Sequence, residues 1–113
     1  MQYDRNNIFA KILRGELPCN KVYEDDCVLA FHDIRPEAPV HVLVIPKGEY
    51  VSFDDFVRSD YDISAFFKTV GHIAHKLGLR MGGYRLVTNH GAAAGQVVYH
   101  FHVHILGYQK SSS

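Results

Sequence analysis

Apolar and polar residues alternate along this chain with two different periods, and the change of period marks where helices and strands are expected. Over residues 60–78 the apolar residues recur every three to four positions, which predicts a long amphipathic helix. Ser59, with Asp62 three residues later, forms a capping box for its start. Gly78 followed by Leu79 predicts a Schellman motif at its end.

A shorter helix and several strands complete the predicted elements. The first helix should be capped by Asn6 or Asn7, and its apolar residues are Ile8, Phe9, Ile12 and Leu13. Strands are expected in the β-prone segments at residues 21–24, 27–32, 40–45, 84–88 and 99–107. Because the links between successive strands are short, the sheet should be mostly antiparallel. This order of about five strands and two helices predicts an α+β fold.

Length and composition agree with one domain over residues 1–113, with short flexible ends at about 1–5 and 109–113. Lys and Arg together number 12, as do Asp and Glu, so no net charge attracts nucleic acid. No apolar run reaches the roughly 20 residues of a membrane span, and the first residues are polar. We therefore expect a cytoplasmic protein, without membrane or nucleic-acid partners, in which both cysteines are thiols.

The segment "YHFHVHILG", residues 99–107, places His100, His102 and His104 at alternate positions. On a strand these side chains share one face at intervals of about 6.6 to 7 Å, and the apolar residues between them face the core. Burying all three imidazoles would require partners for every ring nitrogen. We therefore expect the three histidines to be exposed or to line a cleft.

Two chemistries suit such a cluster. Zinc would accept neighbouring histidines with His41 as a further ligand, but the outer histidines of the strand lie about 13 Å apart, which leaves one unused. In nucleophilic catalysis a neutral imidazole attacks phosphorus, while the others orient groups or donate protons. The small residues of "NHGAAAGQ", residues 89–96, would let backbone N–H groups approach phosphate oxygens. The spacing favours phosphoryl chemistry and leaves zinc open.

Three segments resemble a known family. "HFHVHIL" matches the signature of the histidine triad superfamily, in which histidines alternate with apolar residues. "IFAKILRGELPC", "FHDIRPEAPVHVLVIPK" and "GQVVYHFHVHILG" resemble, in order and spacing, its Hint branch of nucleotide-binding proteins. The resemblance extends from about residue 6 to residue 108. It implies a homodimer that hydrolyses purine nucleoside 5'-phosphoramidates to the monophosphate, with no metal and no cofactor.

The resemblance also implies roles for individual residues. His102 would attack the α-phosphorus and form a nucleotidyl-histidine, His104 would assist the leaving group, and His100 and His41 would complete the polar network. The base would lie among apolar side chains; these are Ile8, Phe9, Ile12, Phe31 and Ile34. The ribose would bind Asp33, and the phosphate would bind near Asn89, Gly95, Gln96 and Val97.

Val97 departs from the Hint pattern, which usually has serine at this position. The valine side chain offers no hydrogen bond, and losing one to a charged group costs roughly 1.5 to 3 kcal/mol, so slower or differently selective turnover is expected, but not inactivity. Other functions stay open. One is a dinucleoside polyphosphate hydrolase of the Fhit type, although that branch usually has "LPR" where this chain has "LGY". The others are a zinc-binding protein and a nucleotide-binding interaction protein with weak catalysis. Nucleotidylyl transferases have glutamine in place of His104, so water is the expected final acceptor.

Overall fold

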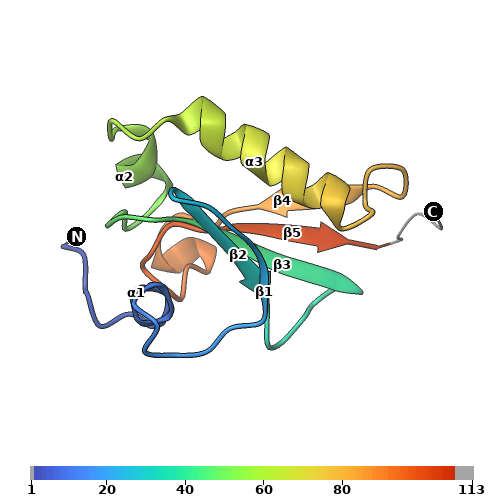
Figure 1. The fold of residues 1–113 in the computed structure, drawn as a ribbon. Coiled ribbons are helices and arrows are strands. Elements are labelled where there is room, and N and C mark those ends of the chain that lie inside the picture. The colour runs from blue at the N-terminus through green and yellow to red at the C-terminus, as the bar shows by residue number, and fades with distance from the viewer. Residues whose placement is uncertain (1, 109–113) are drawn as a thin grey trace.

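The computed structural model describes residues 2–108, and its centre is a five-stranded antiparallel sheet (Figure 1). The strand order across the sheet is β1-β2-β3-β5-β4. The strands are β1 Lys21–Glu24, β2 Val28–His32, β3 Val40–Pro46, β4 Tyr84–Val87 and β5 Val103–Gly107. Every neighbouring pair is antiparallel, which confirms the predicted α+β fold. The predicted tail at 109–113 lies outside the described residues.

Within residues 2–108, three α-helices and one short 3-10 helix pack around the sheet: α1 Ile8–Leu13, α2 Phe53–Val57, α3 Ile63–Lys76 and η1 Ala92–Ala94. α1 begins after Asn7, whose side chain accepts the Ala10 N–H. The sequence pattern missed α2, because five residues are too few to show a helical period. No helix among the described residues is long and apolar enough to cross a membrane.

The predicted start of the long helix is corrected by one local detail. The carboxylate of Asp62 caps α3 by accepting the Ala65 N–H at 3.0 Å. Ser59 instead donates its hydroxyl to the Phe56 carbonyl at 2.6 Å, because α2 ends just before it. The predicted Schellman end is confirmed, since Leu79 N–H donates to the Ala74 carbonyl at 3.1 Å.

The sheet has an apolar core on both of its faces. α2 and α3 cover one face, where Val42, Val44 and Ile105 pack with Phe56 and Phe66. α1 lies on the opposite face (Figure 1), and Phe9 packs there against side chains of β2 and β3: Leu29, Phe31, Leu43 and Ile45. Since α1 has only six residues, it covers much less of its face than α3 covers. The α1 face is therefore where a site can lie beside the sheet.

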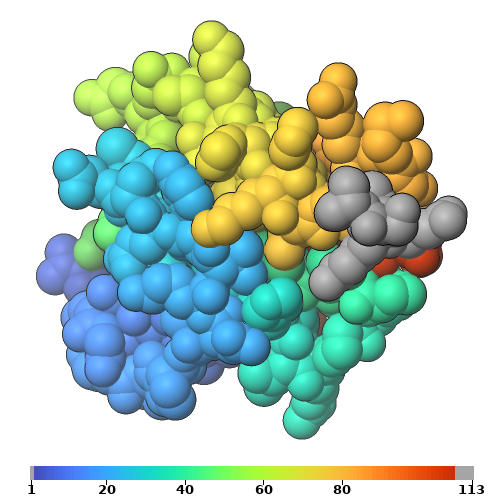
Figure 2. Space-filling model, turned by 45° about the vertical axis from the view of Figure 1, so that its right-hand side comes forward, coloured from blue at the N-terminus to red at the C-terminus, as the bar shows by residue number. Residues whose placement is uncertain are grey.

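The edges of the sheet are formed by β1 and β4. The β1 segment lies beside the C-terminal part of α3 (Figure 2), where the Lys76 ammonium donates to the Val22 carbonyl at 3.0 Å. On β4, Tyr84 and Leu86 are exposed large side chains. The homodimer implied by the resemblance stays a prediction.

The last strand begins later than predicted. Residues 99–102 precede β5, and the β3–β5 pairing runs only from Val40–Gly107 to Val44–Val103. Beyond that pair β3 ends at Pro46, which has no N–H for another ladder bond. The chain turns there, and Phe101 N–H donates to the Tyr50 carbonyl at 2.7 Å. Strand alternation therefore places His104, but not His100 or His102.

Candidate active site

The imidazole of His102 is buried and makes one hydrogen bond to the main chain. Its Nδ1 lies 2.7 Å from the His100 carbonyl oxygen, and because a carbonyl only accepts, Nδ1 carries the proton. The lone pair is therefore on Nε2. The edge-to-face ring of Phe9 lies 5.0 Å away between centroids. Burial lowers the pKa of His102, so its ring is neutral near pH 7. A neutral imidazole with a free Nε2 lone pair is a nucleophile.

His100 does not line a cleft, contrary to the prediction. It is fully buried; its Nε2–H donates to the Pro46 carbonyl at 2.9 Å, and its Nδ1 accepts the Tyr3 hydroxyl at 2.6 Å. Burial lowers its pKa to about 4. The prediction failed here because the chain leaves the strand before residue 103, so strand alternation no longer sets the direction of this side chain. His100 contributes to the site through its carbonyl, which orients His102.

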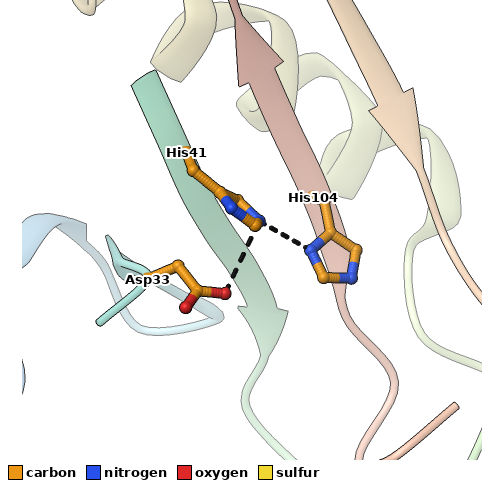
Figure 3. Close-up of side chains that lie close together, drawn as sticks. All are labelled: Asp33, His41 and His104. Atoms are coloured by element: carbon orange, nitrogen blue, oxygen red, sulfur yellow. Dashed lines mark hydrogen bonds and ion pairs between the residues drawn. The ribbon is translucent and has the colours of Figure 1, made fainter. Parts of the chain in front are cut away.

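His104 belongs to a second chain of contacts, with His41 and Asp33 (Figure 3). The Glu37 N–H donates to His41 Nδ1 at 3.1 Å, so the proton of His41 is on Nε2. This Nε2–H faces His104 Nδ1 at 2.9 Å and Asp33 Oδ2 at 3.5 Å. His104 Nδ1 is then an acceptor, and the proton of neutral His104 is on Nε2.

The rings of His102 and His104 lie side by side, with centroids 5.0 Å apart. Burial lowers the pKa of His104 to about 4, and the neighbouring His102 and His41 contribute to this shift. One ring presents a lone pair and the other presents an N–H. Such a pair can attack an electrophile while it donates a proton to a neighbouring group.

The predicted phosphate loop is held in shape by its own side chains. The buried amide of Gln96 accepts the Gly91 N–H at 2.9 Å and donates to the Val51 carbonyl at 2.7 Å. Asn89 donates to the Ala94 carbonyl at 2.9 Å. Gly91 and Gly95 have φ angles of 89° and 92°, which residues other than glycine rarely adopt. Asn89 and Gln96 therefore shape the loop with their side chains, and the N–H groups of Ala94, Gly95 and Gln96 donate to carbonyls within the same loop.

The residues predicted around the nucleoside divide into two groups. Phe9, Ile12 and Phe31 belong to the apolar cluster on the α1 face, and Phe9 and Phe31 are buried. Ile8 and Ile34 are exposed, Ile34 to 92%. Asp33 Oδ1 accepts the Arg35 N–H at 2.8 Å, so part of its carboxylate stabilises a turn. Val97 is 85% exposed on the loop.

Comparison with known proteins identifies the family. The sequence pattern of the HIT domain matches residues 14–111. The chain belongs to the HIT domain family. Two uncharacterized HIT-like proteins are similar along their length: one from Azospirillum brasilense is 51% identical over 105 residues, 91% of this chain and 86% of that protein. One from Rickettsia prowazekii is 48% identical over 110 residues, 96% of this chain and 92% of that protein.

Solved HIT structures share the whole fold. A HIT family hydrolase from Legionella pneumophila superposes with a TM-score of 0.84 at 42% identity, over 93% of this chain and 95% of that chain. A histidine triad protein from Clostridium difficile has the same TM-score of 0.84 at 41% identity, over 100% of this chain and 98% of that chain. Likeness at this level confirms the HIT-like α+β fold.

In this HIT domain a metal ion fits the histidines poorly. The ligand atoms of Asp33, His41 and His104 lie within 4.8 Å of one another, as a metal site requires. A metal on His41 Nε2 would, however, leave the proton of the neutral ring on Nδ1, where the Glu37 N–H already points. The donor arrangement therefore favours a chain of hydrogen bonds over zinc ligation.

Two contacts of the HIT site were not found from the sequence. Tyr3 lies in the predicted flexible end, 97 residues from the His100 ring that it contacts. An aromatic residue in the polar start "MQYDRNN" was the only local signal. The approach of Asp33 to His41 had none, because it depends on how the turn after β2 meets β3.

Proposed function

We propose that this HIT domain is a hydrolase of the Hint type that cleaves the P–N bond of purine nucleoside 5'-phosphoramidates through a nucleotidyl-histidine at His102. The observation that carries the proposal is the contact of His102 Nδ1 with the His100 carbonyl, which directs a lone pair to Nε2. The Nε2–H of His104 supplies a neighbouring proton donor. The name of the Legionella relative, a HIT family hydrolase, supports hydrolysis.

The reaction has two displacement steps. First, the Nε2 electron pair of His102 forms a bond to the α-phosphorus. The bond from phosphorus to the amine nitrogen breaks, its electron pair stays on that nitrogen, and His104, which is protonated on both ring nitrogens for this step, donates its Nε2 proton to it and becomes neutral. Second, water attacks phosphorus and gives a proton to His104, while the P–N bond to His102 breaks and returns its electron pair to Nε2. The products are the amine and the nucleoside monophosphate.

Substrate binding follows from the groups around the histidines. Exposed Ile8 and Ile34 offer apolar surface to a flat purine. Asp33 precedes Ile34 and offers carboxylate oxygens to ribose hydroxyls. Because the N–H groups of Ala94, Gly95 and Gln96 donate within the loop, the backbone N–H of the following Val97 would meet a phosphate oxygen. The Val97 side chain offers the leaving group no hydrogen bond.

A fluorogenic adenosine phosphoramidate tests the proposal. The wild-type protein should release the amine and adenosine monophosphate, and His102→Ala should lower kcat/KM by at least about a thousandfold. Acid-quenched wild-type protein should carry one nucleotide on His102, detectable by mass spectrometry. The matched control is His72→Ala, an exposed histidine on α3 that should leave activity unchanged. Cleavage at an undiminished rate by His102→Ala would overturn the proposal.

A further inference from the structure

Asp33 lies beside the hydrogen-bonded pair of rings His41 and His104. Its Oδ1 accepts the Arg35 N–H at 2.8 Å, whereas its Oδ2 lies 3.5 Å from His41 Nε2. Figure 3 shows this carboxylate beside the His41 ring, which in turn contacts His104. The His41 side chain is only 1% exposed, and that of Asp33 is 21% exposed. A carboxylate in this place acts on both rings with little screening by water.

The Asp33 carboxylate matters for the protons that lie between His41 and His104. In the neutral site one proton, that of His41 Nε2, lies between His41 and His104, whose nitrogens are 2.9 Å apart. If His104 takes a second proton, the proton must go to Nδ1, and two N–H groups then face each other. His41 cannot relieve this by moving its own proton to Nδ1, because the Glu37 N–H occupies that side. An oxygen of Asp33 lies within 4.8 Å of a nitrogen of each ring, so a small movement of this carboxylate would let it accept both N–H groups.

We propose that Asp33 is a positioning residue for the acid–base step: it accepts the N–H groups of His41 and His104 when His104 is an imidazolium, and so lets His104 protonate the leaving group. This inference rests on the proposed function and adds a second role to a residue expected to bind ribose. The groups that face His104 are His102, His41 and Asp33. Burial, followed by the two imidazoles, lowers the pKa of His104, and among these groups the Asp33 carboxylate raises it.

The proton balance holds through both displacement steps. The His104 imidazolium gives its Nε2 proton to the amine nitrogen as the P–N bond breaks. His104 is then neutral with its proton on Nδ1, bound to Asp33. Its free Nε2 lone pair takes a proton from the attacking water and restores the imidazolium. Asp33 thus holds the same Nδ1 proton throughout, and the proton that moves is always at the Nε2 of His104.

The first test needs no substrate. Imidazole nitrogen signals are followed by NMR as a function of pH in the wild-type protein and in Asp33→Asn, which keeps an Oδ1 acceptor for the Arg35 N–H. The pKa of His104 should be lower in Asp33→Asn by about one unit or more, because the cation loses its charged acceptor. The matched control is Asp54→Asn, an exposed carboxylate that lies 3.8 Å from another histidine, His90, and this change should leave the pKa of His104 unchanged. An unchanged pKa of His104 in Asp33→Asn overturns the inference.

The second test separates proton donation from ribose binding. Single-turnover rates are measured for two substrates of one nucleotide, an alkylamine phosphoramidate and a p-nitrophenyl ester, whose phenolate leaves without a proton. Asp33→Asn should slow the amidate about tenfold, the factor that corresponds to one pKa unit, and the ester less than about twofold. The difference should persist with 2',3'-dideoxynucleotides. Equal slowing of both substrates overturns the acid–base role. If the wild-type protein cleaves neither substrate, the proposed function fails, and the titration still decides whether Asp33 supports the His104 cation.

Discussion

At the scale of single residues, the direction of each proton in the site follows from backbone groups. The His100 carbonyl fixes the tautomer of His102, and the Glu37 N–H fixes that of His41 and, through it, that of His104. Side chains alone would leave each neutral imidazole two possible tautomers. The backbone therefore decides which ring nitrogen carries a proton and which one carries a lone pair.

Val97 is the residue at which this chain departs from the pattern it resembles. Its side chain is 85% exposed, so serine fits without strain on the core. Val97→Ser should raise kcat/KM for phosphoramidates by about tenfold or more, because a hydroxyl can hydrogen-bond a charged group in the transition state. The matched control is Val57→Ser, an exposed valine on α2, which should leave the rate unchanged. No gain from Val97→Ser would show that residue 97 does not supply the missing donor.

At the scale of secondary structure, local chemistry sets the ends of α3. Asp62 accepts the Ala65 N–H at the start, and the turn at Gly78 binds the last carbonyls. Both ends depend on residues within a few positions, so the sequence predicted this helix well. The choice between Ser59 and Asp62 as cap depended on the neighbouring helix α2, which a five-residue pattern does not reveal.

The corrected cap can be measured directly. Asp62→Ala should lower the free energy of unfolding by about 1 kcal/mol, because an N–H at the helix start loses its partner. Asp60→Ala, an exposed aspartate two positions earlier, should change it by less than about 0.5 kcal/mol. Urea denaturation provides both values. A loss no larger for Asp62→Ala than for Asp60→Ala would contradict the assignment of the cap.

At the scale of the whole molecule, folding buries histidines whose neutral form is favoured in the free protein. Burial lowers the pKa of His100 to about 4, and that of His104 also to about 4, from an ordinary value of 6.5. In the window between these pKa values the unfolded chain binds protons that the folded chain does not bind. The folded state therefore keeps its full stability with respect to these histidines above about pH 6.5, and the free energy of unfolding falls as the pH falls toward 4.

The free energy of unfolding should accordingly fall as the solution is acidified from about pH 6.5 toward pH 5. Midway through the window, a buried histidine such as His100 contributes a slope of about 1.4 kcal/mol per pH unit. Urea denaturation across this range measures the slope. His75→Gln, which removes an exposed histidine of α3, is the control and should keep it. A free energy of unfolding that does not change over this range would contradict the burial of neutral His100.

The sequence by itself determined the features that depend on neighbouring residues: five strands, the first and the long helix, the Schellman end, and the three histidines beside a glycine-containing loop. The tertiary structure alone decided which imidazoles are buried. The pairing of β3 with β5 stops before Pro46, so residues 99–102 leave the strand and their side chains do not follow its alternation. It also brought Tyr3 to His100 and Asp33 to His41. The physical reason is that periodicity reports the local direction of side chains, whereas tautomers and burial depend on atoms that are distant in sequence and meet only when the sheet is complete.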